Sequence, residues 1–233
     1  FSITDSPDKG TFGYTHFVTK DYTDERYVTK TSYHQINPQH FFYILREMSN
    51  LIQIQHPTLL SIDGFSYEDF DGSNKLTVLM DYLENGSLSN FISKPDSLTN
   101  TNRQIILIGI SYAMNLLHSK NIIHRLLKPS NVLLDKKYHP QVTDFVLSKL
   151  FNPYNLIQSQ SKANSRTVFY LAPEVIKNNR YSKSSDVYSF GILMYELLSG
   201  KFAYDDLFND KDFSVAKFKS LLLKEKIRPK IDF

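Results

Sequence analysis

The pattern of hydrophobic and polar positions predicts a small β-rich part followed by a mainly helical part. Residues 10–19 and 26–31 have the composition of two strands, joined by the polar turn DYTDER. Asn37 and Pro38 then form a helix start, because Asn is a capping residue and Pro fits the first turn. The predicted helix continues to residue 55, and its apolar stripe consists of Ile44, Met48, Leu51 and Ile52.

Three further segments complete the predicted elements. Lys75–Tyr82 has the sequence of a buried strand, and the polar connection LENGSL follows it. Leu98–His118 has the periodicity of a long helix. Asp186 opens the apolar segment DVYSFGILMYELLSG, which we expect to be a buried helix that ends at Gly200.

Composition limits the classes of protein to which the chain can belong. Its 233 residues suffice for one large core or for two small lobes around a cleft. The net charge is +3, with 27 basic and 24 acidic residues interspersed, which argues against nucleic acid or an anionic membrane as partner. No apolar run reaches the roughly 20 residues of a membrane span, and no signal-peptide pattern is present. The chain has no cysteine, which excludes disulfides and thiolate metal sites, and the cytoplasm is the expected location.

The segment Ile122–Phe145, IIHRLLKPSNVLLDKKYHPQVTDF, carries the most specific chemistry in the chain. It resembles the catalytic loop and the metal-binding strand of protein kinases, whose pattern is H-R-D-L-K-x-x-N followed by D-F-G. The matching residues are His124, Arg125, Leu127, Lys128, Asn131, Asp144 and Phe145. Two positions depart from the pattern: Leu126 replaces the Asp that accepts the substrate proton, and Val146 replaces the Gly.

The resemblance assigns the phosphate side of a kinase site to four residues. Asp144 and Asn131 would supply oxygen ligands of the type that Mg²⁺ prefers. Lys30 would hold the phosphates of ATP, and Lys128 would neutralise charge on the transferred group. Leu126 has no lone pair with which to accept a proton, so the predicted site lacks a base that contributes about 10²–10⁴ in rate.

Lys30 ends the strand Tyr27–Lys30, which resembles the V-A-I-K strand of kinases. Val28 shares a strand face with Lys30, and its bulk would weaken adenine binding without excluding it. Glu47 lies at the spacing of the helical acid that steadies this lysine in the family. Taken alone, Lys30 and Glu47 have the alternative reading of ordinary surface residues.

The kinase glycine-rich loop, G-x-G-x-x-G-x-V, corresponds here to Asp8, Gly10, Gly13 and Thr15. Gly10 and Gly13 are retained, whereas an acid stands at the first position and a polar residue at the last. A carboxylate near a triphosphate is unfavourable. The motif is weak by itself, and the alternative is an ordinary hairpin with two turn glycines.

The resemblance places the adenine end of the pocket at the end of the strand Lys75–Tyr82. Met80 corresponds to the gatekeeper, and Asp81–Leu83 corresponds to the hinge whose backbone would meet adenine. Leu133, which follows the catalytic loop, belongs to the same predicted nucleotide-binding set. The alternative is a strand and loop without a binding role.

Residues 147–171 correspond to the activation segment and precede the motif Ala172-Pro173-Glu174. The candidate phosphorylation sites in this segment are Ser159, Ser161, Ser165 and Thr167. A phosphate on any of them would pair with Arg125, and the alternative is a mobile polar loop.

Three residues have expected structural roles. His124 should support Phe145 by packing rather than act as a base, and Asp186 should anchor the backbone of the catalytic loop. Val146 should restrict the flip of Asp144 and Phe145, because a β-branched residue cannot reach the backbone angles of Gly without strain.

Together the motifs predict an α+β, bilobal protein-kinase-like fold. Residues 1–82 would form an N-lobe with a small antiparallel sheet and one helix, and residues 83–233 a mainly helical C-lobe that is incomplete at its C-terminus. The sequence Val187–Gly191 resembles the tyrosine-kinase-like group of serine/threonine kinases. The expected function is that of a pseudokinase, a signalling module for protein partners that retains a site for ATP and Mg²⁺. The alternative is a serine/threonine kinase of low activity, with a protein substrate.

Overall fold

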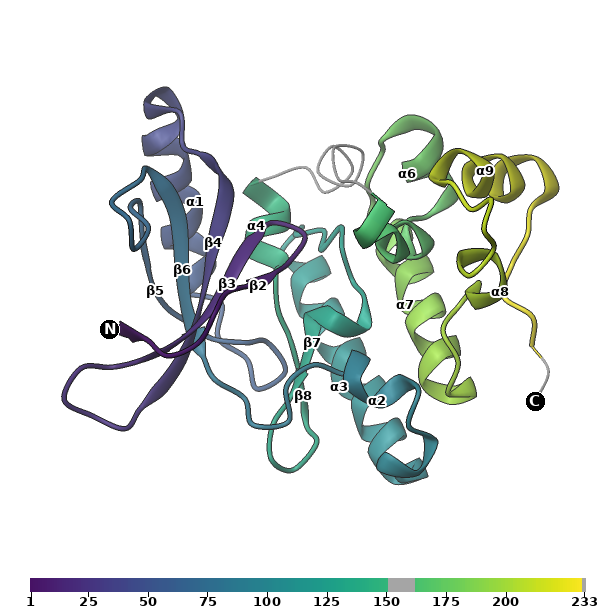
Figure 1. The fold of residues 1–233 in the computed structure, drawn as a ribbon, viewed down its shortest axis with the longest axis horizontal. Coiled ribbons are helices and arrows are strands. Elements are labelled where there is room, and N and C mark those ends of the chain that lie inside the picture. Colours follow the sequence, from purple (N-terminus) through teal and green to yellow (C-terminus); the bar gives the residue numbers. More distant parts are fainter. Residues whose placement is uncertain (151–161, 232–233) are drawn as a thin grey trace.

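The first part of the chain is an antiparallel sheet with one long helix beside it (Figure 1). The computed structural model describes residues 1–150 and 162–231. The strands follow the order β1-β3-β4-β6-β5, and β2 pairs with β3. Their bounds are Ser2–Ile3 (β1), Asp8–Lys9 (β2), Gly13–Thr19 (β3), Arg26–Gln35 (β4), Ile62–Ser66 (β5) and Lys75–Asp81 (β6).

The predicted hairpin is present, with two adjustments. The turn between β3 and β4 is closed by the Lys20 amide, which donates to the Glu25 carbonyl at 3.0 Å. The first predicted strand is interrupted, because Gly10 folds back and donates to the carbonyl of Gly13 at 2.8 Å. β4 continues to Gln35, four residues beyond the predicted end.

Helix α1 (Phe41–Ile52) lies beside the sheet. Asn37 Oδ1 accepts from the Gln39 amide at 3.0 Å, so it caps the 3-10 turn Pro38–His40 that precedes α1 rather than α1 itself. The predicted apolar stripe faces the core, with Ile44, Met48 and Leu51 buried. The helix ends three residues before the predicted end at residue 55.

The second part of the chain is mainly helical (Figure 1). Its helices are α2 (Ser89–Ile92), α3 (Asn100–Ser119), α4 (Phe145–Leu150), α6 (Pro173–Asn178), α7 (Lys183–Ser199), α8 (Asp205–Phe208) and α9 (Val215–Ser220). The short strands β7 (Val132–Leu134) and β8 (Pro140–Val142) pair antiparallel beneath the cleft. The predicted α+β fold with a β-rich N-lobe and a helical C-lobe is confirmed.

Capping residues mark the ends of the two predicted long helices, α3 and α7. Thr99 caps α3 by accepting from the Asn102 amide at 3.1 Å. Ser182 caps α7 through a reciprocal pair of hydrogen bonds with Ser185, so the helix begins at Lys183, three residues before the predicted start at Asp186. Gly200 ends α7 with a φ of +68°, the left-handed conformation that favours glycine.

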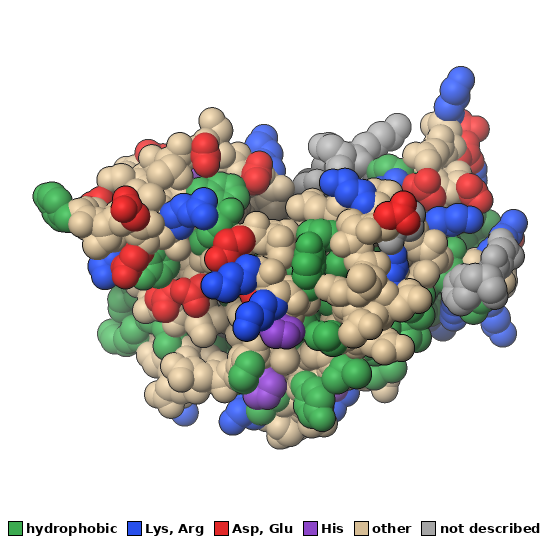
Figure 2. Space-filling view, turned by 90° about the horizontal axis from the view of Figure 1, so that it is seen from below, with side chains coloured by type: hydrophobic (Ala, Val, Ile, Leu, Met, Phe, Trp, Pro, Cys, Tyr) green, Lys and Arg blue, Asp and Glu red, His purple; other side chains and the backbone are tan. Residues whose placement is uncertain are grey.

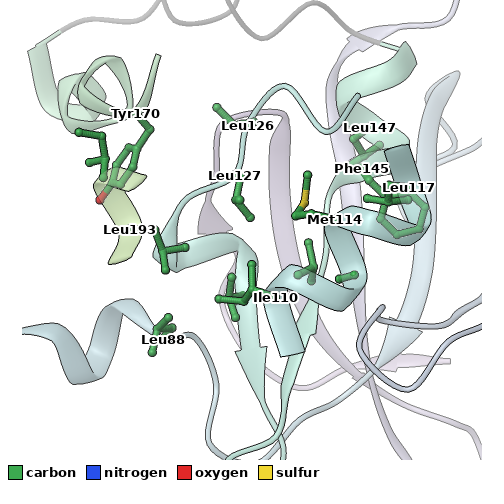
Figure 3. Packing of buried hydrophobic residues seen from close by; sticks show 14 of the residues in the cluster. Leu88, Ile110, Met114, Leu117, Leu126, Leu127, Phe145, Leu147, Tyr170 and Leu193 are labelled. Atoms are coloured by element: carbon green, nitrogen blue, oxygen red, sulfur yellow. The ribbon is translucent and has the colours of Figure 1, made fainter. Parts of the chain in front are cut away.

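Apolar side chains of both lobes belong to one core cluster. The members labelled in Figure 3 all lie in the C-lobe. The cluster includes Ile110 and Met114 of α3, Leu127 of the catalytic loop and Phe145 of α4. α3 passes so close to β8 that a Cβ on Gly109 would lie 2.4 Å from the Pro140 ring. This close packing fixes α3 against β8, next to the loop that connects α3 to β7.

The molecular surface carries charges of both signs. Acidic and basic side chains lie next to one another on the face drawn in Figure 2. Within residues 1–150 and 162–231, no helix has the length and apolar character needed to cross a membrane.

Candidate functional site

A cavity of about 610 Å³ lies between the sheet and the C-lobe. The predicted site residues that line it are Gly10, Gly13, Val28, Lys30, Met80, Leu83, Lys128, Asn131, Leu133 and Asp144. The structure therefore brings together residues that are up to 134 positions apart in the sequence (144 − 10). Among the described residues, three predicted ones are not part of the lining: Glu47, Asp81 and Leu126.

Lys30 enters the cavity from the middle of β4. In the sheet it lies between Thr15 of β3 and Val78 of β6. Its ammonium forms an ion pair with Asp144 Oδ1, and the side chains of Lys30 and Asp144 are 21% and 6% exposed. Water screens the attraction in such an ion pair only weakly, and removing one partner would leave the other as an unpaired buried charge.

The expected ion pair between Lys30 and Glu47 is not formed in this structure. Among the ion pairs of the described residues, Lys30 pairs with Asp144. The sequence spacing placed Glu47 on the correct helix, but the position of that helix relative to β4 depends on packing. Helix α1 contacts α4, the turn that directly follows Asp144, so the segment after Asp144 influences where Glu47 lies.

The backbone changes direction at Asp144. Its φ is +71°, and α4 begins at the next residue, Phe145. The Ser148 amide donates to the Asp144 carbonyl at 3.0 Å and closes the first turn. Val146 is the second residue of this helix and has right-handed backbone angles, which a β-branched residue adopts without strain. The replacement of Gly by Val is thus compatible with the conformation observed, and the expected restriction of the flip stays a prediction.

Lys128 connects three segments at the phosphate end of the cavity. Its ammonium donates to Thr11 Oγ1 and to Thr167 Oγ1, both at 3.0 Å. Burial lowers the pKa of Lys128 from 10.5 to about 8, with the Asp144 carboxylate opposing the shift and Lys30 adding to it. At pH 7 the group is therefore still mainly a cation that can bind a phosphate oxygen.

Leu126 does not project into the cavity. Its side chain is 1% exposed and belongs to the core cluster (Figure 3). Its carbonyl accepts from Asn131 Nδ2 at 2.8 Å, which fixes the amide and leaves the Asn131 carbonyl oxygen as the group available to a ligand. Because its side chain turns into the protein, Leu126 removes the base without making the cavity itself apolar.

The catalytic loop is anchored from below by Asp186 of α7. Its carboxylate accepts from the amides of His124 at 2.8 Å and Arg125 at 2.9 Å, and from His118 Nε2 at 2.8 Å. The carboxylate is 1% exposed, so these bonds are shielded from water. The predicted anchoring role of Asp186 is confirmed.

His124 is fully buried under the loop. Its Nε2 donates to the Thr143 carbonyl at 2.9 Å, and its Nδ1 accepts from the Leu126 amide at 3.3 Å. Burial lowers the pKa of His124, so the ring is neutral at pH 7. Both nitrogens hold backbone groups in place, as expected for a structural histidine.

The glycine-rich hairpin covers the cavity. A Cβ on Gly13 would lie 1.7 Å from the Thr31 carbonyl oxygen, so only glycine fits at this position of β3. A Cβ on Gly10 would come no closer than 3.4 Å to another atom. Phe12, between the two glycines, is buried and lines the cavity.

The adenine side of the cavity is mainly apolar. Val28 pairs with Met80 across β4 and β6, and both face the cavity together with Leu83 and Leu133. Asp81 is exposed at the end of β6, so only its backbone belongs to the hinge. Sequence reasoning missed Phe17, which also lines the cavity. It could have been found, because alternation along β3 puts Phe17 on the same face as Gly13 and Thr15.

The predicted partners of Arg125 are only partly within the described residues. Arg125 Nη1 donates to the Ser148 carbonyl at 3.2 Å. Ser159 and Ser161 lie outside the described residues, as does the Ser165 side chain. Thr167 is buried, and its hydroxyl is bound by Lys128, so in this structure it belongs to the cleft instead of pairing with Arg125.

Comparison with known proteins identifies the family. The family model described as "Protein kinase domain" matches residues 8–231. The chain is 31% identical over 207 residues to "cAMP-dependent protein kinase type 3" of Saccharomyces cerevisiae, covering 86% of this chain and 48% of that protein. It is 34% identical over 165 residues to "Serine/threonine-protein kinase STE11" of the same yeast, covering 69% of this chain and 22% of that protein.

A human relative gives the same assignment. The chain is 34% identical over 160 residues to "3-phosphoinositide-dependent protein kinase 1" of Homo sapiens, covering 68% of this chain and 28% of that protein. The chain thus spans about half or less of the length of these relatives. From the matched range, the bilobal fold and the cleft residues, we conclude that the chain belongs to the protein kinase domain family.

Proposed function

We propose that this chain is a pseudokinase, a signalling module that uses the kinase fold and a nucleotide site to bind protein partners. The observation that carries the proposal is the state of Leu126. The position at which the family has its proton acceptor holds a hydrocarbon side chain that is 1% exposed and turned into the core.

The acids that line the cleft do not replace the missing base. Among the described residues these acids are Asp8, Glu84 and Asp144. Asp8 lies on β2 and Glu84 in the connection after β6, so neither belongs to the catalytic loop. Asp144 is bound to Lys30. General-base assistance of about 10²–10⁴ in rate is therefore missing, which is roughly 3–5 kcal/mol of barrier.

The cleft fits a nucleotide. A volume of about 610 Å³ lies within the range of about 300–1,000 Å³ that is usual for small-molecule sites. Val28, Leu83 and Leu133 provide apolar walls for a base, and Lys30 and Lys128 provide positive charge where phosphates would lie. Asp8 opposes this charge at the rim, so we expect binding that is weaker than in a typical kinase.

Asp144 and Asn131 would hold a magnesium ion. Both line the cavity and offer oxygen atoms, and Mg²⁺ needs only one or two protein ligands when phosphates and water complete its shell. The bound ion would neutralise charge on the phosphates. Lys30 would have to share Asp144 with the ion, since the two side chains form an ion pair in this structure.

An alternative is a serine/threonine kinase of low activity. It is favoured by the presence of Lys30, Lys128, Asn131 and Asp144 in one cleft, because phosphoryl transfer depends mainly on positioning and charge neutralisation. The relatives named above are serine/threonine kinases by their names. The assignment to the tyrosine-kinase-like group rests on Val187–Gly191 alone and stays a prediction, as do the lobe boundary at residue 82 and the cytoplasmic location.

Nucleotide binding is tested by thermal denaturation with ATP, with and without Mg²⁺. We expect ATP to raise the melting temperature of the wild type, and Lys30→Met to reduce the rise strongly, because Lys30 is one of the two cations expected to bind the phosphates. Asp144→Asn should remove only the part that depends on Mg²⁺. No shift in the wild type would exclude a nucleotide site and leave a module that acts through its surface alone.

Catalytic silence is tested by phosphate transfer to a generic protein substrate, with Leu126→Asp beside the wild type. Leu126→Asn is the matched control, because it has the shape of Asp without its basicity. The wild type and Leu126→Asn should show no phosphate transfer above background. Because position 126 faces the core, Leu126→Asp restores a base only where its polar side chain turns out towards Lys128 and Asn131, and transfer should then be at least 100-fold faster than in both other proteins. If the wild type transfers phosphate well above background, the pseudokinase proposal is wrong; if it also does so as fast as Leu126→Asp, the chain is an efficient kinase rather than one of low activity.

A further inference from the structure

Arg166 lies in a cage of two aromatic rings and a carboxylate, in the C-lobe and outside the cleft. Its guanidinium carbon is 4.7 Å from the centre of the Phe202 ring and 4.1 Å from the centre of the Phe208 ring. Its Nη2 donates to Asp205 Oδ1 at 2.6 Å. We call Phe202, Asp205 and Phe208 the guanidinium cage.

The cage matches the chemistry of a guanidinium and not simply of a cation. A planar guanidinium stacks on aromatic faces and donates in its plane to a carboxylate, whereas an ammonium is a strongly hydrated point charge. Asp205 is itself held, because its Oδ2 accepts from Asn209 Nδ2 at 3.1 Å. The three cage residues come from α8 and the connection that precedes it, so they form one compact unit.

The fit of Arg166 in this cage is incomplete. Its Nη1 is buried, and among the described residues it has no hydrogen-bond acceptor. The Arg166 side chain is nevertheless 33% exposed and that of Asp205 is 45% exposed, so the cage opens to solvent on one side. An arginine that enters from this side can make the same stacking and ionic contacts and leave its other donors in water.

We propose that the guanidinium cage is a binding site for an arginine side chain of a protein partner, and that Arg166 is its intramolecular occupant. Arg166 directly precedes Thr167, whose hydroxyl is bound by Lys128 in the cleft. Exchange of Arg166 for a partner's arginine would thereby release the segment that touches the phosphate end of the cleft. The cage does not depend on whether the cleft binds ATP.

The test empties the cage and offers it small probes. Arg166→Ala is titrated with N-acetyl-arginine amide and with N-acetyl-lysine amide, and binding is followed by NMR shift changes in the millimolar range. We expect Arg166→Ala to bind the arginine probe at least tenfold more tightly than the lysine probe. The wild type should bind the arginine probe at least tenfold more weakly than Arg166→Ala does, because Arg166 competes.

Further substitutions in the Arg166→Ala background test whether the arginine probe binds in the cage. Adding Asp205→Asn or Phe208→Leu to Arg166→Ala should weaken arginine binding at least fivefold, whereas adding Asp206→Asn, an exposed neighbouring acid, should leave it unchanged. Equal binding of both probes by Arg166→Ala, no saturable binding at all, or insensitivity to Asp205→Asn would overturn the proposal. If Arg166→Ala does not fold, Arg166→Lys serves the same test, because a lysine fills the cage poorly and the arginine probe should still displace it.

Discussion

The catalytic loop and the glycine-rich hairpin both keep the kinase shape while losing kinase chemistry, but they do so in different ways. In the catalytic loop, the replaced residue, Leu126, withdraws into the core, and the retained His124 supports the backbone. In the hairpin, the replaced residue Asp8 stays in the cleft, and the retained Gly13 is required by its contact with β4.

A residue can match the kinase pattern because the fold needs it for packing or because phosphate transfer needs it for chemistry. Gly13 and His124 have packing roles that are needed whether or not phosphate is transferred. Their presence therefore supports the fold but says little about activity. The informative positions are those without such a role: Leu126 and Asp8 depart from the pattern, whereas Lys30, Lys128, Asn131 and Asp144 keep it.

Removing the anchor of the catalytic loop should have the largest effect. Asp186→Ala leaves two buried backbone N–H groups and His118 without an acceptor. We expect the free energy of unfolding to fall by about 3–5 kcal/mol. Urea denaturation measures the loss, and Asp206→Ala, at an exposed site of the same lobe, should change stability by less than about 0.5 kcal/mol. A small effect of Asp186→Ala would mean that the loop holds its shape without the anchor.

A second buried acid of the C-lobe should make stability depend on pH. Burial raises the pKa of Glu196 from 4.5 to about 7, although the Ala203 amide and the Tyr170 hydroxyl both donate to it. The folded state thus binds the proton more tightly than the unfolded chain does. This contribution to stability is fully present below pH 4.5 and is lost as the pH rises through 7, by about 3 kcal/mol.

The control for this pH dependence is Glu196→Gln, which has no titrating group. Urea denaturation between pH 4.5 and 8 should show a shallower slope for the variant than for the wild type. Parallel curves would show that Glu196 is not the group responsible.

Substitution of each of the two glycines tests the structural role assigned to the hairpin. Gly13→Ala forces a Cβ against the Thr31 carbonyl, so we expect a loss of about 2 kcal/mol or more. Gly10→Ala meets no such obstacle and should cost less than about 1 kcal/mol. Similar losses for the two variants would contradict the structural role given to Gly13.

The smallest effect concerns a glycine without a packing role. Gly191 lies inside α7, and an added Cβ would meet no atom within 4 Å. Gly191→Ala should raise the free energy of unfolding by about 0.5–1 kcal/mol, because alanine loses less conformational freedom in a helix. Thermal denaturation measures the gain in stability. A loss of stability in Gly191→Ala would contradict the open space around Gly191.

Much of the fold was predictable because its signals are local. Gly200 as a helix end and the stripe of α1 are short-range features that the sequence predicts, and the order of motifs then indicates the lobes. The caps Thr99 and Ser182 are equally local but were not predicted. The cleft residues were predictable for the same reason, since each lies within a motif. Phe12 and Thr167 were not predicted to line the cleft, because the sequence around them gives no sign of which way the hairpin and the 3-10 helix Lys162–Tyr170 fold.

The sequence by itself determined which chemistry is available: two lysines, an asparagine and an aspartate for phosphate and metal, and a leucine where a base belongs. Only the tertiary structure decided how these groups are used. It paired Lys30 with Asp144 instead of Glu47, and it turned Leu126 into the core. The physical reason is that ion pairs and burial depend on distances between segments far apart in the chain, which are set by the packing of α1, α4 and the sheet and not by local residue order.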